Sequence, residues 1–230
     1  RYKGVDVSKS NGVVYTPLPM AYALSQAMLA AYEGPWPKRI SVLDPAVGEA
    51  ELLLAFVEQV RKAHPQTKIA VVGYDIDSQS CHIAREKLRA RFRDVDIDIR
   101  CKDFLSQVDG SGEKYDFVIA NPPYVRRQVL GSKKAQELAI KYGLSGRVDI
   151  YYSFLVNTGS VLSENGIAGY ITSNKFLSIK SGSPVRKFML ENYRIHAVTD
   201  YGDTKVFENA AVLPCTVVFG NGKTDDFPSV

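Results

Sequence analysis

The sequence predicts a parallel, doubly wound α/β fold, and three features lead to this prediction. Helical patterns alternate with short apolar segments, in the order typical of βαβ units. The segment 117–120 is apolar on both faces, as in a strand buried inside a parallel sheet. Finally, 230 residues of ordinary globular composition, 45% hydrophobic and 23% charged, suffice for one large domain. We find no internal repeat and no low-complexity region.

We expect helices and strands to alternate along the chain. The expected helices cover residues 17–32, 51–63, 78–91, 149–162 and 184–191. The expected strands cover residues 40–44, 69–75, 95–100, 117–120, 166–171, 195–200 and 212–219. Thr16 is a candidate cap for the first helix, with Pro17 in its first turn. Tyr151 and Tyr152 are expected to serve helix packing.

Composition argues against several classes of protein. No apolar run approaches the ~20 residues of a membrane span, so we expect no membrane partner. The three cysteines, Cys81, Cys101 and Cys215, show no CxxC spacing, and no two histidines share a metal-ligand spacing with a cysteine. We therefore expect a reduced, cytoplasmic protein without a metal site.

The basic residues are unevenly distributed. The net charge is +4, yet the window 125–147 holds six basic residues against one acid, a net charge of +5. Such a window is consistent with a solvated loop or with a polyanionic partner. A second basic run, residues 84–93, is more typical of the solvent-facing side of a helix.

The stretch FVIANPPYV, residues 117–125, stops a strand abruptly. Pro122 and Pro123 remove two backbone donors and hold Asn121 outside the helical region. Tyr124 follows this stiff corner directly. The corner could be an ordinary strand-ending turn, so its meaning depends on the rest of the chain.

Polar residues follow four successive strands at the point where each ends. These residues are Asp44, Asp75, Asp103 and Asn121. A carboxylate at such a point is often only a helix cap. However, ligands of open α/β sheets bind beyond the carboxyl ends of the strands, and four polar residues there indicate a ligand site.

The chemistry of this site disfavours a dinucleotide. A nicotinamide site would have GxGxxG after the first strand, whereas this chain has DPAVGEAE at 44–51. The acids there would repel a pyrophosphate. A positively charged cofactor fits better, and S-adenosylmethionine, with its sulfonium and ammonium groups, meets that demand.

With these motifs in order, the sequence resembles the gamma class of amino-directed DNA methyltransferases, which methylate N6 of adenine in restriction-modification and related phage-defence systems. The resemblance covers nearly the whole chain. It is carried by GVVYTP (12–17), DPAVGEAELL (44–53), GYDID (73–77), KDF (102–104), NPPY (121–124), VDIYYSFL (148–155), GIAGYITSNKFL (166–177) and VFENAAVLPCTVVF (206–219). It implies a Rossmann-like, S-adenosylmethionine-dependent fold with a mostly parallel, seven-stranded sheet and an antiparallel last strand.

The resemblance also implies the residues of the site. Asp75 would bind the ribose hydroxyls of the cofactor, and Asp103 the amino group of the cofactor's own adenine. The cofactor pocket would be lined by Thr16, Asp44, Ala46, Gly48, Asp75, Ile76, Asp103, Phe104 and Asn121. Asn121 and the Pro122 carbonyl would grip the amino group of an adenine flipped out of double-stranded DNA, with Tyr124 and Phe207 stacked on its two faces. Candidate DNA contacts are Arg126, Arg127, Lys133 and Lys134.

Two departures from the family pattern stand out. Ala50 and Leu52 occupy positions where the family usually has a glycine and an aromatic residue. Second, such enzymes usually carry a further target-recognition domain, and we expect no such domain after Phe219. We therefore expect residues 1–220 to form the catalytic domain, and 221–230 to be a linker or cut end toward a target-recognition domain outside this chain. Two alternatives are an NPPY-type methyltransferase of protein glutamine or RNA guanine, and a non-catalytic subunit that binds DNA and S-adenosylmethionine.

Overall fold

The structure, a computed structural model, describes residues 16–107, 112–123, 150–202 and 213–223. In this part of the chain seven strands form one sheet in the order β3-β2-β1-β4-β5-β7-β6. The strands are β1 Arg39–Asp44, β2 Lys68–Asp75, β3 Asp96–Cys101, β4 Tyr115–Ala120, β5 Leu162–Ser173, β6 Tyr193–Asp200 and β7 Pro214–Asn221. The helices are α2 Leu18–Ala31, α3 Glu51–Ala63, α4 Ser78–Arg91, α5 Phe104–Gln107, α7 Ile150–Val161, α8 Lys175–Ser178 and α9 Ser183–Asn192, with a 3₁₀ turn η1 at Lys180–Gly182.

Strand pairing divides the sheet into a parallel part and an antiparallel end. Strands β3, β2, β1, β4 and β5 are parallel neighbours. Strand β7 runs antiparallel to both β5 and β6. The prediction of a mostly parallel, seven-stranded sheet with an antiparallel last strand is therefore confirmed.

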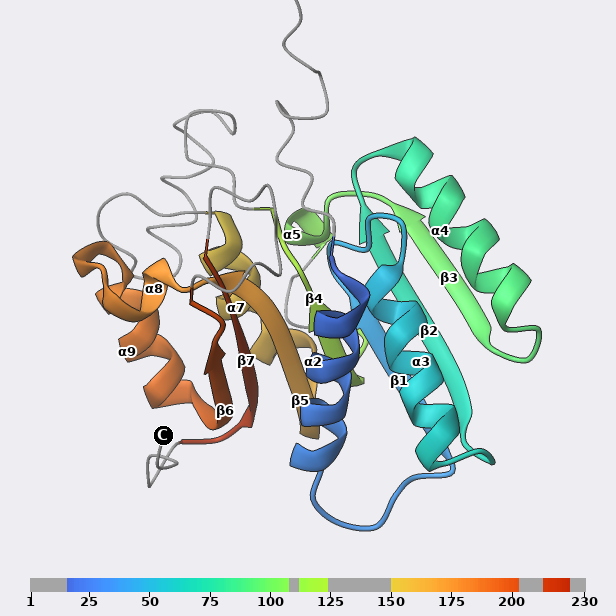
Figure 1. The fold of residues 1–230 in the computed structure, drawn as a ribbon, viewed down its shortest axis with the longest axis horizontal. Helices are drawn as coiled ribbons and strands as arrows, with labels where there is room; N and C mark the ends of the chain where they lie inside the picture. The colour runs from blue at the N-terminus through green and yellow to red at the C-terminus, as the bar shows by residue number, and fades with distance from the viewer. Residues whose placement is uncertain (1–15, 108–111, 124–149, 203–212, 224–230) are drawn as a thin grey trace, which may run out of the picture.

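Helices cover both faces of the sheet (Figure 1). The buried residues of α2, α3 and α4 share one apolar cluster with one face, and those of α5, α7 and α9 share a second cluster with the other. Helix α2 lies very close to β5, because a Cβ added at Gly169 would come within 2.6 Å of the Met28 side chain. Glycine at this position thus permits the contact between helix and sheet.

Most expected elements occur where the sequence places them. Tyr151 and Tyr152 are each 1% exposed, and their rings pack edge to face at 4.5 Å, which confirms the packing role. The prediction that Thr16 caps the first helix is wrong. Pro17 holds the N-cap position, and no side chain caps this end.

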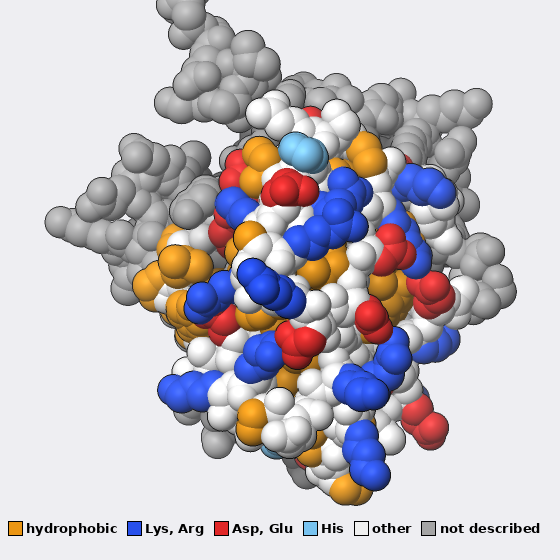
Figure 2. Space-filling view, turned by 90° about the vertical axis from the view of Figure 1, so that its right-hand side faces the viewer, with side chains coloured by type: hydrophobic (Ala, Val, Ile, Leu, Met, Phe, Trp, Pro, Cys, Tyr) orange, Lys and Arg blue, Asp and Glu red, His pale blue; other side chains and the backbone are white. Residues whose placement is uncertain are grey.

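The basic run 84–93 lies on α4 and just beyond it, as expected. Lys87 bonds Glu49 and Glu51, and Arg91 bonds Glu58 at 2.9 Å. Figure 2 shows basic and acidic side chains interspersed over this side of the molecule, without a surface of one sign. In the described part of the chain, no helix is long and apolar enough to cross a membrane.

Candidate cofactor and active site

The carboxyl ends of β3, β2, β1 and β4 lie side by side at one edge of the sheet, because these four strands are parallel neighbours. Asp44 and Asp75 are the last residues of β1 and β2. Asp103 lies two residues beyond β3, and Asn121 directly follows β4. The structure thus brings together the four polar residues that the sequence singled out.

The loop between β1 and α3 is fastened to the end of β2. The Val47 amide donates to the Tyr74 carbonyl at 2.8 Å, and the Gly48 amide donates to Asp75 Oδ2 at 3.0 Å. Gly48 has a φ of +49°, a conformation that glycine adopts without strain. Backbone and carboxylate together therefore hold the loop against the strand ends.

Ala50 also has a positive φ, of 73°, in the left-handed region, at the N-cap of α3. At this position the family that the sequence resembles usually has a glycine. Its side chain is fully buried. The departure therefore keeps the glycine-like backbone shape and adds a buried methyl group at the cost of backbone strain.

Asp44 is a buried acid, only 1% exposed. Its Oδ1 accepts a hydrogen bond from the Ala46 amide at 2.9 Å. Burial raises its pKa to about 8, and the nearby carboxylates of Asp75 and Glu51 act in the same direction. Within the described segments no positive charge offsets its ionised form, so this carboxyl favours a cationic ligand.

The end of β2 presents both polar and apolar groups. Asp75 is half-buried, and its Oδ1 accepts the Asp77 amide at 2.9 Å. Each carboxylate oxygen has two lone pairs, so Asp75 keeps acceptor capacity for a ligand. Ile76 is 78% exposed, an unusual position for a large aliphatic side chain. Asp77 caps α4 through the Ser80 amide at 2.9 Å, so this acid has a structural task.

The segment after β3 forms the next part of the edge. Asp103 Oδ1 accepts the Leu105 amide at 3.1 Å, at the start of α5. Phe104 is 5% exposed, and its ring packs against Tyr74 at 5.6 Å and Phe154 at 5.9 Å. Phe104 thus supports this edge from within the apolar core.

Asn121 is held by a residue far away in the sequence. It is half-buried, and its Nδ2 donates to Thr16 Oγ1 at 2.9 Å. Thr16 is 5% exposed, and Pro122 is buried behind the corner. The beginning of the described chain is thereby joined to the end of β4.

Six residues singled out from the sequence lie outside the described residues. They are Tyr124, Phe207, Arg126, Arg127, Lys133 and Lys134. Their roles in base stacking and DNA contact remain predictions.

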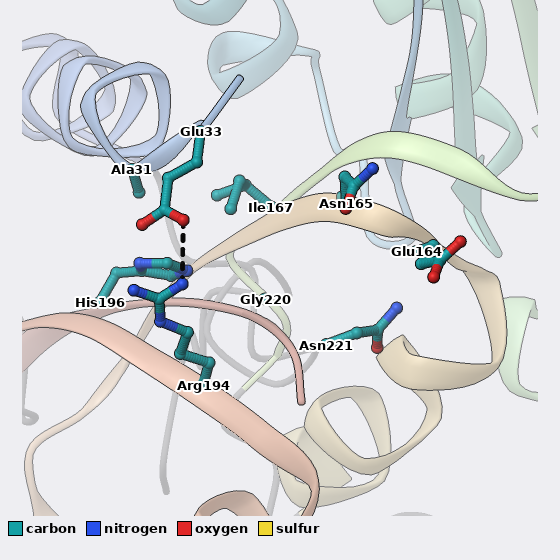
Figure 3. A pocket seen from close by; sticks show the side chains of 10 residues that line it. Ala31, Glu33, Glu164, Asn165, Ile167, Arg194, His196, Gly220 and Asn221 are labelled. Carbon is teal, nitrogen blue, oxygen red and sulfur yellow. Dashed lines mark hydrogen bonds and ion pairs between the residues drawn. The ribbon is translucent and has the colours of Figure 1, made fainter. Parts of the chain in front are cut away.

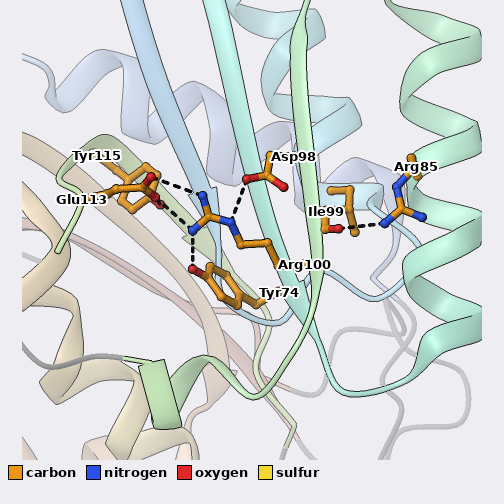
Figure 4. Close-up of polar contacts among 7 residues, drawn as sticks. All are labelled: Tyr74, Arg85, Asp98, Ile99, Arg100, Glu113 and Tyr115. Atoms are coloured by element: carbon orange, nitrogen blue, oxygen red, sulfur yellow. Dashed lines mark hydrogen bonds and ion pairs between the residues drawn. The ribbon is translucent and has the colours of Figure 1, made fainter.

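Sequence reasoning missed a polar cluster around Arg100, near the carboxyl end of β3 (Figure 4). Arg100 on β3 donates to the Tyr74 hydroxyl at 2.6 Å and to Asp98 Oδ2 at 2.7 Å, and it pairs with Glu113 at 3.0 Å. Tyr115 donates to Glu113 at 2.6 Å. One feature of the sequence could have predicted this cluster: an arginine stands one residue before the end of a strand, opposite a tyrosine of the neighbouring strand.

The structure contains a pocket at the opposite edge of the sheet (Figure 3). Its lining includes Glu33 and Arg194, which form an ion pair at 3.0 Å, together with His196 and Asn221. These residues lie at the start of β6, the end of β7 and just beyond α2. The cavity holds about 90 Å³, well below the ~300 Å³ at which small-molecule sites begin. This pocket is therefore not the site of the expected cofactor.

The three cysteines are free thiols, and two of them lie close to the strand ends that carry the acids. The Cys81 thiol donates to the Asp75 carbonyl at 3.6 Å, and Cys101 is the last residue of β3. Burial raises the pKa of Cys215 to about 12, which keeps its thiol protonated at neutral pH. In the described segments no group of three or more His, Cys, Asp and Glu side chains is arranged to hold a metal ion.

This chain is similar to known proteins in both sequence and fold. Residues 69–207 match the Eco57I restriction-modification methylase family. Type II methyltransferase M.BanIII from Aneurinibacillus aneurinilyticus is 36% identical over 232 residues, covering 94% of this chain and 39% of that protein. The chain thus spans about two fifths of the length of this relative.

Two solved structures have a TM-score of 0.77. One is a Listeria monocytogenes protein assigned to the class I S-adenosylmethionine-dependent methyltransferases, 17% identical, covering 99% of this chain and 65% of that one. The other is the type IIG restriction endonuclease BpuSI, 19% identical, covering 94% of this chain and 26% of that one. At these identities the likeness establishes the fold.

The sheet order and these neighbours establish the fold of the S-adenosylmethionine-dependent methyltransferases, and the buried Asp44 at its strand ends suits a cationic cofactor. Within the class, the chain belongs to the Eco57I restriction-modification methylase family.

Proposed function

We propose that this protein methylates the N6 amino group of adenine in double-stranded DNA, as part of a restriction-modification or related phage-defence system. The observation that carries the proposal is the placement of Asn121. It stands on a proline-stiffened corner, at the same edge as Asp44 and Asp75, and a buried threonine holds its amide. The family match supports a DNA substrate.

The chain's own residues would hold the cofactor at this edge. Asp75 would accept hydrogen bonds from the ribose hydroxyls of the cofactor. Asp103 would accept one from the amino group of the cofactor's own adenine. The exposed Ile76 offers an apolar surface for a flat ring, and Asp44 opposes positive charge. Thr16, Ala46, Gly48 and the Phe104 segment complete the pocket. When bound, S-adenosylmethionine would supply an electrophilic methyl group on a sulfonium, with a neutral thioether as the leaving group.

Asn121 and Pro122 would activate the target. The amino group of adenine is a poor nucleophile, because its lone pair is delocalised into the ring. Two acceptors, Asn121 Oδ1 and the Pro122 carbonyl, would bind its two hydrogens and favour a pyramidal nitrogen with a localised lone pair. Acceleration then comes from positioning and preorganised electrostatics. After transfer the nitrogen loses one proton to solvent, so no strong base is needed.

The remaining roles belong to residues outside the described segments. Tyr124 and Phe207 would stack on the two faces of a flipped adenine, and stacking of this kind contributes roughly 1–3 kcal/mol per base. The phosphates would be contacted by Arg126, Arg127, Lys133 and Lys134. Residues 1–220 would form the catalytic domain, with 221–230 leading toward a target-recognition domain in the rest of the protein. The match covers only 39% of M.BanIII, so that relative is long enough to hold a further domain.

Nucleoside mass spectrometry of cells that express the full-length protein tests the proposal. We expect N6-methyladenine in DNA with the wild type and only background with the Asn121→Ala variant. N4-methylcytosine in place of N6-methyladenine would contradict the adenine assignment. Unmodified DNA with methylated guanine in RNA or methylated glutamine in protein would favour the alternative methyltransferases, and no modification at all would favour a non-catalytic subunit.

A further inference from the structure

The Thr16–Asn121 hydrogen bond joins two residues that are 105 positions apart in the sequence. Thr16 as a whole is 5% exposed, so this hydrogen bond lies in a largely buried environment. The hydroxyl does not cap α2, where the amides of Met20 and Ala21 both bond the Pro17 carbonyl. Within the described segments, this hydroxyl therefore serves as an acceptor for the side-chain amide of Asn121.

A primary amide has two chemically opposite ends, because Nδ2 donates hydrogen bonds and Oδ1 accepts them. The amide terminus of asparagine turns easily about its last torsion, which has broad minima. When Nδ2 is held by an acceptor, Oδ1 is directed to the other side of the side chain. An acceptor on Nδ2 thus determines where the carbonyl end of Asn121 is presented.

We propose that Thr16 is a positioning residue, whose hydroxyl fixes the amide of Asn121 so that Oδ1 is presented to the amino hydrogens of the target base. The assignment of the base rests on the proposed function. Thr16 itself need not touch the base, and its effect passes through Asn121. The stiff corner at Pro122 and Pro123 fixes the backbone of the clamp, whereas Thr16 fixes its side chain.

This role sets the expected size of the effect. Losing one neutral hydrogen bond of ordinary strength lowers the population of the productive orientation roughly three- to tenfold. The loss is smaller than that expected on removing the acceptor itself, which is on the order of 10²–10³ in turnover. In addition, replacing Thr16 should have no further effect once Asn121 is alanine, because the two changes remove the same interaction.

The test compares Thr16→Val, Thr16→Ser and the matched control Thr67→Val in the full-length protein. Thr67 Oγ1 accepts the Trp36 indole N–H at 2.8 Å, directly before β2 and at the opposite edge of the sheet. The control therefore removes the same kind of hydrogen bond far from Asn121. The measurements are single-turnover DNA methylation at saturating cofactor, the dissociation constant of S-adenosylmethionine, and the Asn121 side-chain amide signals in asparagine-labelled protein.

We expect Thr16→Val to lower the saturated rate roughly three- to tenfold and to shift the Asn121 amide signals. Thr16→Ser keeps the hydroxyl and should recover most of the rate and of the amide signals lost in Thr16→Val, whereas Thr67→Val should resemble the wild type in both measurements. A Thr16→Val enzyme with weaker cofactor binding but an unchanged saturated rate would overturn the proposal, since Thr16 would then only line the cofactor pocket. If the wild type methylates no DNA, the proposed function fails by itself, and unchanged amide signals in Thr16→Val would separately refute the positioning role.

Discussion

At the scale of single residues, Ala50 combines a favourable and an unfavourable feature. Its left-handed backbone costs an alanine roughly 1–2 kcal/mol, whereas its buried methyl group contributes about 0.8 kcal/mol. Ala55, in the interior of α3, is equally well buried but has no such strain.

We expect Ala50→Gly to change the free energy of unfolding by less than about 1 kcal/mol, because relief of strain offsets the lost methyl group. Ala55→Gly should cost about 2 kcal/mol, because it loses a methyl group and places glycine inside a helix. Urea denaturation of both variants measures the difference. Equal destabilisation would show that Ala50 is not strained.

Asp44 couples protonation to stability. Its pKa is about 8 in the folded protein, above the ~3.9 of an unfolded aspartate. Its contribution to stability is complete below pH 4 and is lost as pH rises toward 8, because the unfolded state releases this proton first. In the absence of cofactor, Asp44→Asn should therefore give a flatter dependence of the free energy of unfolding on pH between 4 and 8.

Asp77→Asn is the control for this measurement. Hydrogen bonds from Ser80 lower the pKa of Asp77, so its contribution is lost only as pH falls below 4. Denaturation curves between pH 4 and 8 should have the same slope in Asp77→Asn and wild type. If Asp44→Asn also keeps the wild-type slope, Asp44 of the wild-type protein is already ionised throughout this pH range. Its pKa in the folded protein would then not be raised.

Single residues also show what the sequence could not predict. Asp44, Asp75 and Asn121 stand at strand ends, and parallel strand order alone is enough to bring them together. The Thr16 contact depends on where the start of α2 lies relative to β4, and no local pattern encodes such a distance. Thr16 was therefore expected as a helix cap, because threonine before proline is ordinary helix-start chemistry.

At the scale of elements, long periodic segments were predictable and single turns were not. Helices α3 and α4 begin and end at the expected residues, since their apolar spacing extends over several turns. The four-residue helices α5 and α8 were missed. A single turn buries little surface of its own, and its conformation is decided by tertiary contacts.

Arg100, near the carboxyl end of β3, connects three parts of the sheet. It joins β3 to Tyr74 on β2 and to Glu113 just before β4, although β1 separates β2 from β4. The Arg100 side chain is 28% exposed, and its guanidinium binds three partners at once, a geometry that lysine cannot reproduce.

We expect Arg100→Lys to destabilise the protein by about 1–2 kcal/mol in thermal or chemical denaturation. The control is Arg39→Lys, because Arg39 forms a simple, exposed pair with Asp96 in which the side chains are 64% and 75% exposed. Its effect should lie within about 0.5 kcal/mol of zero. Equal effects of the two substitutions would show that the Arg100 cluster acts only as surface charge.

At the scale of the whole molecule, the basic window 125–147 follows the NPPY corner directly in the sequence. Each phosphate contact contributes about 0.9 to the slope of log affinity against log salt. Replacing four of these residues together should therefore lower DNA affinity and reduce that slope by roughly 3–4. The variant carries Arg126→Ala, Arg127→Ala, Lys133→Ala and Lys134→Ala.

The matched control removes four basic residues near the opposite edge of the sheet, by Lys38→Ala, Arg39→Ala, Lys62→Ala and Lys68→Ala. All four are exposed. Both variants lose the same net charge, so a general charge effect would weaken DNA binding equally. A reduced salt slope in the first variant alone, measured by titration of labelled duplex DNA, places the phosphate contacts in the window.

The chemistry at Asn121 is the central claim, and single-turnover methylation of adenine-containing DNA by full-length Asn121→Ala tests it most directly. The side chain is proposed to act on the base, so its loss should slow the methylation step by a factor on the order of 10²–10³, while the dissociation constant of S-adenosylmethionine changes much less. Thermal denaturation of the same variant checks that the fold persists. A near-normal rate in a folded Asn121→Ala enzyme would contradict the account, because the NPPY corner would then be only a turn.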